Sequence, residues 1–423
     1  MWLAGYRLLL WLLFPWVLLR LWWRGRKQPG YRLHVSERFG FYGAAPAKPV
    51  IWLHAVSVGE TRAAEPLLRA LRKRHPDHEV LLTQMTATGR EAARQLFGDE
   101  VRLAYLAYDY PSSVRRFLRH FRPRLGILME TEIWFNLVRE CVAADVPLVL
   151  ANARMSEKSY RGYDLVAPLA REAFRRIRVV AAQTDLDAGR LQRLGAQTVK
   201  VTGNLKFDVV APAAMQGLAG RLRAWYGKRP VFLAASTREG EEELLLDAMA
   251  SAQLGDAVTV LVPRHPQRFD EVAGLLERRS LRFARRSSLD ALPIDCSFVL
   301  GDSMGEMAAY YGACDVAFVG GSLLPYGGQN LIEACALGVP VLLGPHTYNF
   351  ADAAEEAVDR GAALRAQDAQ QVLIQARTLL RDAGLRDRMA QAGVRFCSAH
   401  QGATARTLEL VEALIPGASD RAP

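Results

Sequence analysis

Residues 50–60 read Val-Ile-Trp-Leu-His-Ala-Val-Ser-Val-Gly-Glu, and this stretch decides the fold. The apolar run at residues 50–54 predicts a buried strand, and a helical pattern follows from Thr61 to Arg74. A strand that leads into a helix through a short glycine-containing turn is the repeating unit of a parallel α/β sheet.

The same alternation continues along the chain in two series. A connection rich in Pro, Ala and Gly at residues 208–230 separates them. We expect strands at residues 50–54, 80–83, 125–129, 147–151, 179–182 and 199–202, and then at 231–235, 258–262, 298–300, 316–319 and 340–343. The sequence therefore predicts an α/β protein with two Rossmann-like, doubly wound domains that face a cleft, with ligands at the carboxyl ends of the strands. The last helical stretch, residues 369–414, is expected to pack back across both domains.

The first 27 residues differ from the rest of the chain. Residues 8–19 form an apolar run, and residues 1–40 carry seven basic side chains against one acidic one, out of a net charge of +10. A cleaved signal peptide would need small residues at a cleavage site, and residues 21–27 offer none. A membrane-spanning helix would need about 20 apolar residues, whereas this run is shorter and contains Pro15.

A helix that lies in or dips into a bilayer fits this segment best. Arg24, Arg26 and Lys27 would then face the headgroups of an anionic phospholipid membrane surface. If the helix does span the membrane, the basic cluster behind it keeps the rest of the chain in the cytoplasm. We therefore expect three parts: a membrane anchor at 1–27, an N-terminal domain at 28–207 and a C-terminal domain at 208–423.

Several kinds of site find little support in the sequence. The five cysteines are scattered without a Cys-x-x-Cys pair, which indicates a reducing compartment rather than a disulfide framework. The eight histidines show no ligand spacing that we recognise, and no phosphate-binding Walker loop is present. Asp185 and Asp187 match the acidic pattern of metal-dependent transferases, but helix capping explains them better. We expect no metal, no other cofactor and no nucleic-acid partner.

Polar side chains follow the expected strands of the first domain. Ser57 and Glu60 have the spacing of a helix capping box, which spacing alone favours. Alternatively, the helix dipole holds Glu60 ionised, so that it accepts a proton from an attacking hydroxyl. Thr86 and Thr88 either cap a helix or bind a phosphate or a sugar, and neither role is favoured.

Three more polar groups of this domain stand at strand ends. Glu130 follows the strand at 125–129, where a carboxylate is better placed to bind than to pack. Arg154 repeats this placement after the next strand, and Lys206 supplies a cation beside the expected cleft.

The second domain has its own series of polar loops at strand ends. A guanidinium such as that of Arg264 grips a phosphate through two hydrogen bonds. A glycine-rich loop at residues 320–330 leads into a helix, whose first N–H groups would bind a nucleotide phosphate while Glu333 holds ribose hydroxyls. The candidates in these loops are Ser236, Thr237, Pro263, Arg264, Met304, Gly305, Glu306, Gly328, Gln329, Asn330 and Glu333.

Together these motifs resemble those of the 3-deoxy-D-manno-octulosonic acid (Kdo) transferases of Gram-negative bacteria, glycosyltransferase family 30, which have the GT-B fold. The matching stretches are 54–60, 86–89, 130–134, 152–156, 203–207, 263–266, 327–330 and Glu333. Phe135 stands where many members have proline, and Gln329 where many have histidine. Both departures leave the neighbouring motif residues intact.

The resemblance implies a role for each matched residue. Glu60 becomes the general base, which overrides the preference for a mere cap, and Glu130 and Lys206 become catalytic. The contacts to CMP fall on Pro263, Arg264, Met304, Gly305, Glu306, Asn330 and Glu333. The donor is then CMP-Kdo and the acceptor the lipid A precursor lipid IVA. The implied location is the cytoplasmic side of the inner membrane in a Gram-negative bacterium. The resemblance implies that CMP leaves from the face opposite the attack, so the anomeric configuration inverts. Because CMP is a monophosphate, the resemblance implies no need for a diphosphate-bound metal.

Two other classes of function remain open. A GT-B enzyme that acts on a UDP-sugar, either a glycan transferase or an epimerase, would share the glycine-rich loop and Glu333. It would not be expected to combine them with the anchor, Glu60 and Glu130. A non-catalytic scaffold at the membrane surface would have no reason to hold Glu60, Lys206 and Arg264 at strand ends.

Overall fold

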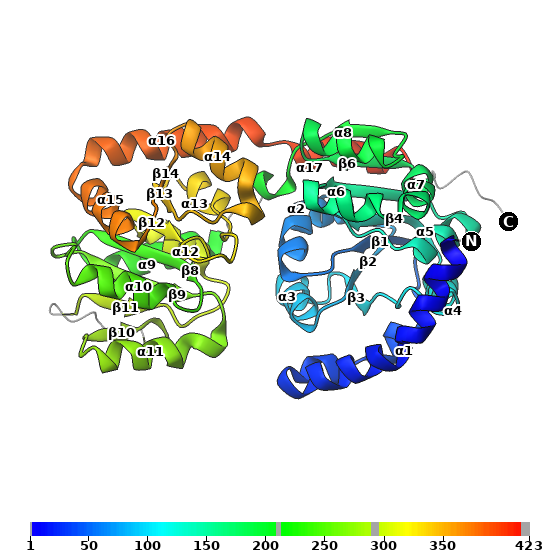
Figure 1. Ribbon diagram of the computed structural model, residues 1–423, viewed down its shortest axis with the longest axis horizontal. Coiled ribbons are helices and arrows are strands. Elements are labelled where there is room, and N and C mark those ends of the chain that lie inside the picture. The colour runs from blue at the N-terminus through cyan, green and yellow to red at the C-terminus, as the bar shows by residue number, and fades with distance from the viewer. Residues whose placement is uncertain (1, 209–212, 289–295, 416–423) are drawn as a thin grey trace. The chain divides into compact units, whose positions relative to one another are not determined.

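The computed structural model describes residues 2–208, 213–288 and 296–415. The chain divides into two compact units (Figure 1). The first unit comprises Met1–Val209 together with Gln401–Pro423, and the second comprises Val210–His400. The first unit is therefore built from two separate segments of the chain.

The first unit contains a parallel seven-stranded sheet in the order β3-β2-β1-β4-β5-β6-β7. Its strands are β1 Val50–His54, β2 Glu79–Gln84, β3 Arg102–Tyr105, β4 Pro123–Met129, β5 Leu148–Ala153, β6 Val179–Ala182 and β7 Val199–Val201. Its helices are α1 Trp2–Lys27, α2 Val58–Arg74, α3 Ala87–Phe97, α4 Pro111–Phe121, α5 Phe135–Ala143, α6 Glu157–Asp164, α7 Ala167–Arg176, α8 Asp185–Arg193 and α17 Ala403–Glu412. Short 3₁₀ helices cover η1 Pro29–Arg32, η2 Val35–Phe39 and η3 Leu205–Asp208.

The second unit repeats the design with a parallel sheet in the order β10-β11-β9-β8-β12-β13-β14. Its strands are β8 Val231–Thr237, β9 Val258–Pro263, β10 Phe283–Arg285, β11 Phe298–Leu300, β12 Val316–Val319, β13 Val341–Leu343 and β14 Ala363–Arg365. Its helices are α9 Ala213–Tyr226, α10 Glu241–Met249, α11 Phe269–Arg278, α12 Met307–Ala313, α13 Ile332–Ala336, α14 Ala351–Asp359, α15 Ala369–Arg381 and α16 Ala383–His400. Three 3₁₀ helices are η4 Pro266–Arg268, η5 Arg286–Ser288 and η6 Tyr348–Phe350.

Strand β1 shows why these sheets need helices on both faces. All five of its residues are buried. Val50 and Trp52 belong to one apolar cluster, whereas Ile51 and Leu53 belong to a second one. Because successive side chains of a strand point to opposite faces, these two clusters fill the two faces of the same sheet. The pattern confirms the doubly wound α/β fold.

The C-terminal part of the chain is divided between the units. The helical stretch expected at residues 369–414 forms three helices, of which α15 and α16 belong to the second unit and α17 to the first. Ala403, Leu408 and Val411 of α17 join the apolar cluster that also contains Leu67 of α2. The polypeptide thus returns to the first unit after completing the second.

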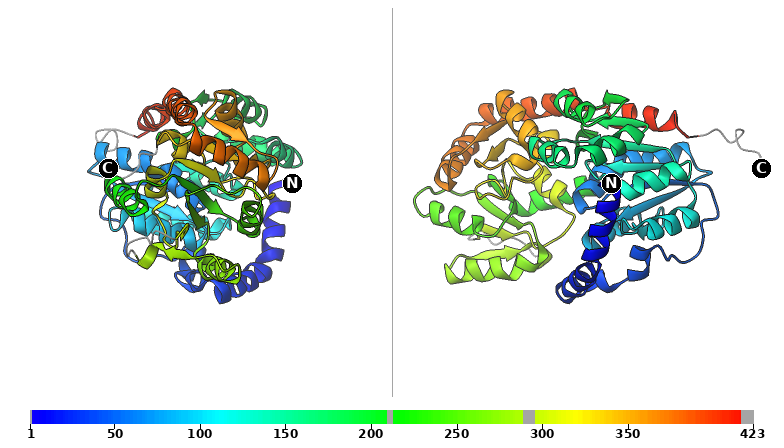
Figure 2. Two further views of the ribbon diagram at one scale, coloured as in Figure 1. Left: turned by 90° about the vertical axis from the view of Figure 1, so that its left-hand side faces the viewer. Right: turned by 45° about the vertical axis from the view of Figure 1, so that its right-hand side comes forward.

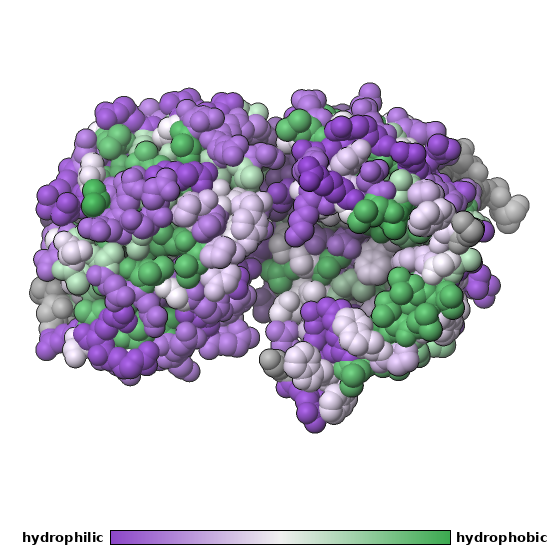
Figure 3. Space-filling model, viewed as in Figure 1, coloured by the Kyte–Doolittle hydropathy of each residue, from purple (hydrophilic) through white to green (hydrophobic). Residues whose placement is uncertain are grey.

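Helix α1 lies against the rest of the first unit along much of its length (Figures 1 and 2). The Tyr6 hydroxyl donates to Asp109 at 2.8 Å, the Arg7 Nε donates to Asn136 at 2.8 Å, and Tyr110 donates to the carbonyl of Leu10 at 2.9 Å. Its other face exposes leucine and tryptophan side chains and forms a hydrophobic patch (Figure 3). Within the described residues, α1 is the one helix long and apolar enough to cross a membrane by length and composition.

Candidate functional site

Glu60 lies in the first turn of α2, directly after the loop that follows β1. The hydroxyl of Ser57, the N-cap, accepts a hydrogen bond from the Glu60 N–H at 3.4 Å and lies 3.0 Å from Glu60 Oε1, to which it donates. The N–H of Val56 donates to Glu60 Oε2 at 2.9 Å. The capping geometry expected from the spacing is therefore present, and the same bonds fix the orientation of the carboxyl group.

Burial, together with the neighbouring charges of Glu130 and Glu132, raises the pKa of the Glu60 carboxyl to about 8. The bonds from Val56 and Ser57 oppose this shift without cancelling it. The expectation that the helix N-terminus keeps Glu60 ionised is thus wrong in direction, because loss of solvent and two nearby carboxylates outweigh the dipole. A carboxyl group with a pKa near the working pH suits a general base.

Glu130 lies one residue beyond β4 and has a left-handed backbone conformation, with φ of 56°. Its carboxylate Oε1 lies 3.4 Å from the Lys206 Nζ. A non-glycine residue in this conformation costs of the order of 1 kcal/mol or more, and such strain gathers at functional sites. The structure therefore brings together Glu60, Glu130 and Lys206, although these residues lie far apart in the sequence.

Asn152 positions the segment that carries Lys206, and the sequence analysis did not name it as a site residue. Its side-chain Oδ1 accepts the N–H of Leu205 at 3.0 Å, and its own backbone has a φ of 53°. It is fully buried within β5. The available sequence signal was a polar residue directly after an apolar run.

The remaining candidates of the first unit have mixed outcomes. Thr86 is the N-cap of α3 and accepts the N–H of Gly89 at 3.0 Å, so the capping role is confirmed. Thr88 is exposed in the first turn of that helix, and Arg154 is half-buried after β5. Asp187 accepts hydrogen bonds from Thr184 and from the N–H of Met155. The reciprocal bonds between Thr184, the N-cap of α8, and Asp187 confirm a capping role for Asp187, while the Met155 bond ties Asp187 to the end of the β5 loop.

The glycine-rich loop of the second unit, residues 320–330, is held close to the loop that follows β8. A Cβ at Gly320 would lie 2.5 Å from the carbonyl oxygen of Ser236, so only glycine fits there. Fully buried Glu241 accepts the N–H groups of Gly321 at 2.6 Å and Leu323 at 2.9 Å. Ser236 itself has a φ of 56°. Glu241 thus fixes the course of the loop.

Arg264 lies directly after β9, where its N–H donates to the Thr237 carbonyl at 2.9 Å. Its Nε donates to Gln329 at 3.1 Å, which joins the β9 loop to the glycine-rich loop. Pro263 is buried at the end of β9, and Gly328 has a φ of 77° within the glycine-rich loop. The predicted candidates of two loops therefore meet in the structure.

The end of the glycine-rich loop leads into α13. The Asn330 Oδ1 accepts the N–H of Ile332 at 3.1 Å, and its Nδ2 donates to Glu333 at 3.1 Å. Both side chains are half-buried. Their oxygen and nitrogen atoms form a compact polar set of the kind that binds sugar hydroxyls.

The loop after β11 contributes a separate group of candidates. The Glu306 carboxylate accepts from Ser303 at 2.6 Å and from Arg286 at 3.0 Å. Met304 and Gly305 are exposed beside it, and Gly305 has a φ of 80°. Arg286 was not identified from the sequence, since a lone arginine at the edge of the sheet gives no signal by itself.

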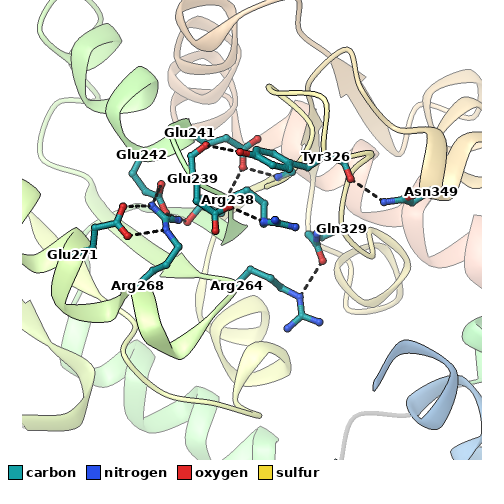
Figure 4. A network of polar contacts seen from close by, with 12 residues as sticks. Arg238, Glu239, Glu241, Glu242, Arg264, Arg268, Glu271, Tyr326, Gln329 and Asn349 are labelled. Carbon is teal, nitrogen blue, oxygen red and sulfur yellow. Dashed lines mark hydrogen bonds and ion pairs between the residues drawn. The ribbon is translucent and has the colours of Figure 1, made fainter. Parts of the chain in front are cut away.

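A buried ion pair between Arg268 and Glu242 lies beside the loops that follow β8 and β9 (Figure 4). Arg268 donates to both oxygens of Glu242, at 2.7 and 3.0 Å, and Glu242 also accepts from Thr237 at 2.6 Å. Removing one partner of such a pair leaves an uncompensated charge and costs about 3–5 kcal/mol. The pair thus anchors Thr237, one of the predicted site residues.

Comparison with known families identifies both halves of the chain. A model described as "3-Deoxy-D-manno-octulosonic-acid transferase (kdotransferase)" matches residues 33–209. A model described as "Glycosyl transferases group 1" matches residues 226–396.

Solved structures with this arrangement include a glycosyltransferase from Rickettsia africae ESF-5, with a TM-score of 0.59 and 11% identity over 88% of this chain and 100% of that chain. A UDP-GlcNAc 2-epimerase from Neisseria meningitidis reaches a TM-score of 0.59 at 16% identity, over 86% of this chain and 100% of that one. At these identities the likeness concerns the fold alone, and it confirms the expected GT-B-like architecture.

Two relatives match nearly the whole chain. The 3-deoxy-D-manno-octulosonic acid transferase of Bordetella pertussis is 46% identical over 419 residues, which cover 95% of this chain and 96% of the relative. The enzyme of the same description from Haemophilus influenzae is 37% identical over 420 residues, which cover 97% and 98%. The chain belongs to the 3-deoxy-D-manno-octulosonic acid transferase family.

Proposed function

We propose that this protein transfers Kdo from CMP-Kdo to the lipid A precursor lipid IVA, with inversion at the anomeric carbon and without a metal ion. The observation that carries the proposal is the grouping of Glu60, with a raised pKa, beside the Glu130–Lys206 pair at the carboxyl ends of β1 and β4. Membership of the family supports Kdo as the transferred sugar, and the arrangement of the site supports general-base catalysis of the transfer.

Glu60 acts as the general base in the proposed reaction. A primary hydroxyl of the acceptor gives its proton to a Glu60 carboxylate oxygen while the hydroxyl oxygen forms a bond to the anomeric carbon of Kdo. The bond from that carbon to the CMP phosphate oxygen breaks, and CMP leaves with the electron pair. Attack on the face opposite the leaving group inverts the configuration.

Each unit offers a cation for a negatively charged group of the substrates. Lys206 faces the charge of the donor carboxylate or of the departing phosphate, and its ion pair with Glu130 fixes its position. In the second unit, Arg264 binds the phosphate of CMP, while Asn330 and Glu333 bind the ribose hydroxyls. Because CMP is a monophosphate, Lys206 and Arg264 supply the positive charge that a metal supplies to a diphosphate.

The substrate experiment uses the purified full-length protein with CMP-Kdo and lipid IVA. Mass analysis of the lipid is expected to show an added Kdo, and free CMP is expected in equal amount. UDP-GlcNAc serves as the competing donor. Transfer or epimerisation of UDP-GlcNAc without turnover of CMP-Kdo would overturn the donor assignment, and Kdo release without lipid glycosylation would overturn the acceptor assignment.

The pH dependence of turnover follows from the raised pKa of Glu60. A general base must be deprotonated, so kcat/KM is expected to fall about tenfold per pH unit below pH 8. This fall is the acid limb of the pH profile. Glu130→Gln removes a charge that raises the pKa of Glu60, so the acid limb should move to lower pH, even though turnover itself decreases. Glu65→Gln, on the same helix and paired with Arg69, is the control and should leave the limb unmoved. An acid limb unchanged in Glu130→Gln would contradict the assignment.

We further propose that α1 attaches the protein to the cytoplasmic face of an anionic inner membrane by lying in its interface. The hydrogen bonds of Tyr6, Arg7 and Leu10 hold one face of α1 on the first unit, while the opposite face presents Leu8, Leu12 and Leu19. A helix held this way inserts one apolar face among lipid chains, and its basic residues meet the headgroups.

Leu8, Leu12 and Leu19 lie on one side of α1 and are 62%, 70% and 61% exposed. The variant Leu8→Ser/Leu12→Ser/Leu19→Ser is expected to bind vesicles of phosphatidylglycerol and phosphatidylethanolamine at least about 100-fold more weakly, since each leucine contributes about 1–2 kcal/mol. Leu165→Ser/Leu186→Ser, which changes two exposed leucines outside α1, should bind normally in a co-sedimentation assay. Equal loss in both variants would contradict the role of α1.

A further inference from the structure

The turn between α2 and β2 brings together three metal-ligating side chains that the proposed reaction does not use. His75, Asp77 and His78 each offer one ligand atom, and these atoms lie within 4.8 Å of one another. Glu412, the last residue of α17, approaches the same place from the other end of the sequence. The sequence analysis found no ligand spacing among the histidines, and the fourth residue of this cluster could not be seen there, because Glu412 is 338 positions away from its partner Arg74.

Two distances within this cluster are close to those between neighbouring ligand atoms of a tetrahedral cation site. His78 Nδ1 lies 3.0 Å from Asp77 Oδ1, and His75 Nε2 lies 3.4 Å from Glu412 Oε1. Zinc bonds of about 2.0–2.1 Å at tetrahedral angles place neighbouring ligand atoms about 3.3 Å apart. Two imidazole nitrogens and two carboxylates are also a donor set that zinc accepts.

The two ring nitrogens point to a ligand for a second reason. His75 Nε2 and His78 Nδ1 are buried, and each faces a carboxylate oxygen, Glu412 Oε1 at 3.4 Å and Asp77 Oδ1 at 3.0 Å. Where a ring nitrogen carries no proton, its lone pair meets the lone pairs of that oxygen, and a cation between them satisfies both. A cation among the four groups would accept the lone pairs of both nitrogens at once.

The surrounding structure holds the ligands in place. The N–H of His78 donates to the His75 carbonyl at 3.1 Å, which closes the turn, and the N–H of Glu79 donates to the Pro49 carbonyl at 2.8 Å. The Glu412 Oε2 binds Arg74 Nη1 at 3.0 Å, so its Oε1 faces His75. A carboxylate at the C-terminal end of a helix is disfavoured by the helix dipole, and a cation offsets this cost.

We propose that His75, Asp77, His78 and Glu412 bind one divalent cation of the zinc class, and that this cation fastens the end of α17 to the end of α2. The site is structural rather than catalytic. Glu60 lies in the first turn of α2 and His75 caps its other end, so the two are about 20 Å apart along the helix. The cation therefore stabilises the C-terminal segment of the first unit.

The test uses tag-free, full-length protein stripped with a chelator and titrated with ZnCl₂ in a calorimeter. We expect one zinc per chain, and amide hydrogen exchange is expected to slow in α17 when zinc is added. Substitution of an outer-shell partner of a zinc site costs 10–100-fold in affinity, so loss of two direct ligands in His75→Gln/His78→Gln should cost at least about 100-fold. His34→Gln, a histidine of the same unit outside the cluster, is the control.

Two further variants make the outcome independent of folding defects. Asp77 is 65% exposed, so Asp77→Asn leaves the fold intact and should still weaken zinc binding about tenfold or more. Glu412→Gln should weaken binding and abolish the zinc-dependent protection of α17. Failure of the unaltered protein to bind zinc, or equal affinity in His75→Gln/His78→Gln, would overturn the site. Unchanged protection of α17 in Glu412→Gln would overturn the link to that helix.

Discussion

The Glu60→Gln variant is expected to lose about 10²–10⁴-fold in kcat, because the amide no longer accepts the proton of the attacking hydroxyl. Its oxygen still accepts the Val56 N–H, so the first turn of α2 and the site around it should keep their geometry. The measurement is the rate of CMP release at saturating CMP-Kdo. Turnover close to that of the unaltered protein would exclude Glu60 as the base.

The same variant is expected to be more stable than the unaltered protein at pH 8. The pKa of Glu60 rises from 4.5 to about 8 on folding, so the folded protein holds the proton more tightly and loses stability as the pH rises between these values. Glutamine has no such dependence, so unfolding at pH 8 should cost about 1–3 kcal/mol more in Glu60→Gln, with little difference near pH 4. Glu65→Gln should show no such pattern in a denaturant titration.

Lys206→Met is expected to lower kcat about 10²–10³-fold, the usual effect of removing one group that stabilises charge in a transition state. The loss should be larger than that of Lys200→Met, which removes an exposed cation of β7 in the same unit. A change confined to KM for lipid IVA would assign Lys206 to acceptor binding instead.

The Glu130–Lys206 pair also predicts that the two residues act as a unit. With the side chains 3.4 Å apart, Glu130→Gln/Lys206→Met should cost much less than the sum of the two single effects. Strictly additive losses would show that the two groups contribute separately.

The sequence predicts the interior strands of both sheets and one edge strand, β7, but misses the other three edge strands. Residues 50–53 of strand β1 are all apolar because helices cover both of its faces. The three strands without a prediction, β3, β10 and β14, all lie at the edges, where exposure dilutes the apolar signal.

The candidate site likewise contains residues that the sequence predicts and residues that it does not. The polar loops that follow apolar strands are visible in the sequence, because parallel strands direct their carboxyl ends to one edge of a sheet. The supporting groups are not visible, because each depends on a partner distant in the chain. Asn152 binds Leu205, Glu241 binds Gly321, and His75 meets Glu412. The raised pKa of Glu60 likewise depends on burial in the folded unit and on Glu130, some 70 residues further on.

The two-segment construction of the first unit has a consequence during synthesis of the protein. The carboxylate of Asp208 accepts the N–H groups of Gly402 and Thr404, and Leu408 and Val411 complete the apolar cluster beneath α2. About 190 residues of the second unit must leave the ribosome before these groups arrive, which takes on the order of 10–40 s. The nascent first unit must therefore wait with part of its core uncovered until residues 401–412 have been made and have left the ribosome.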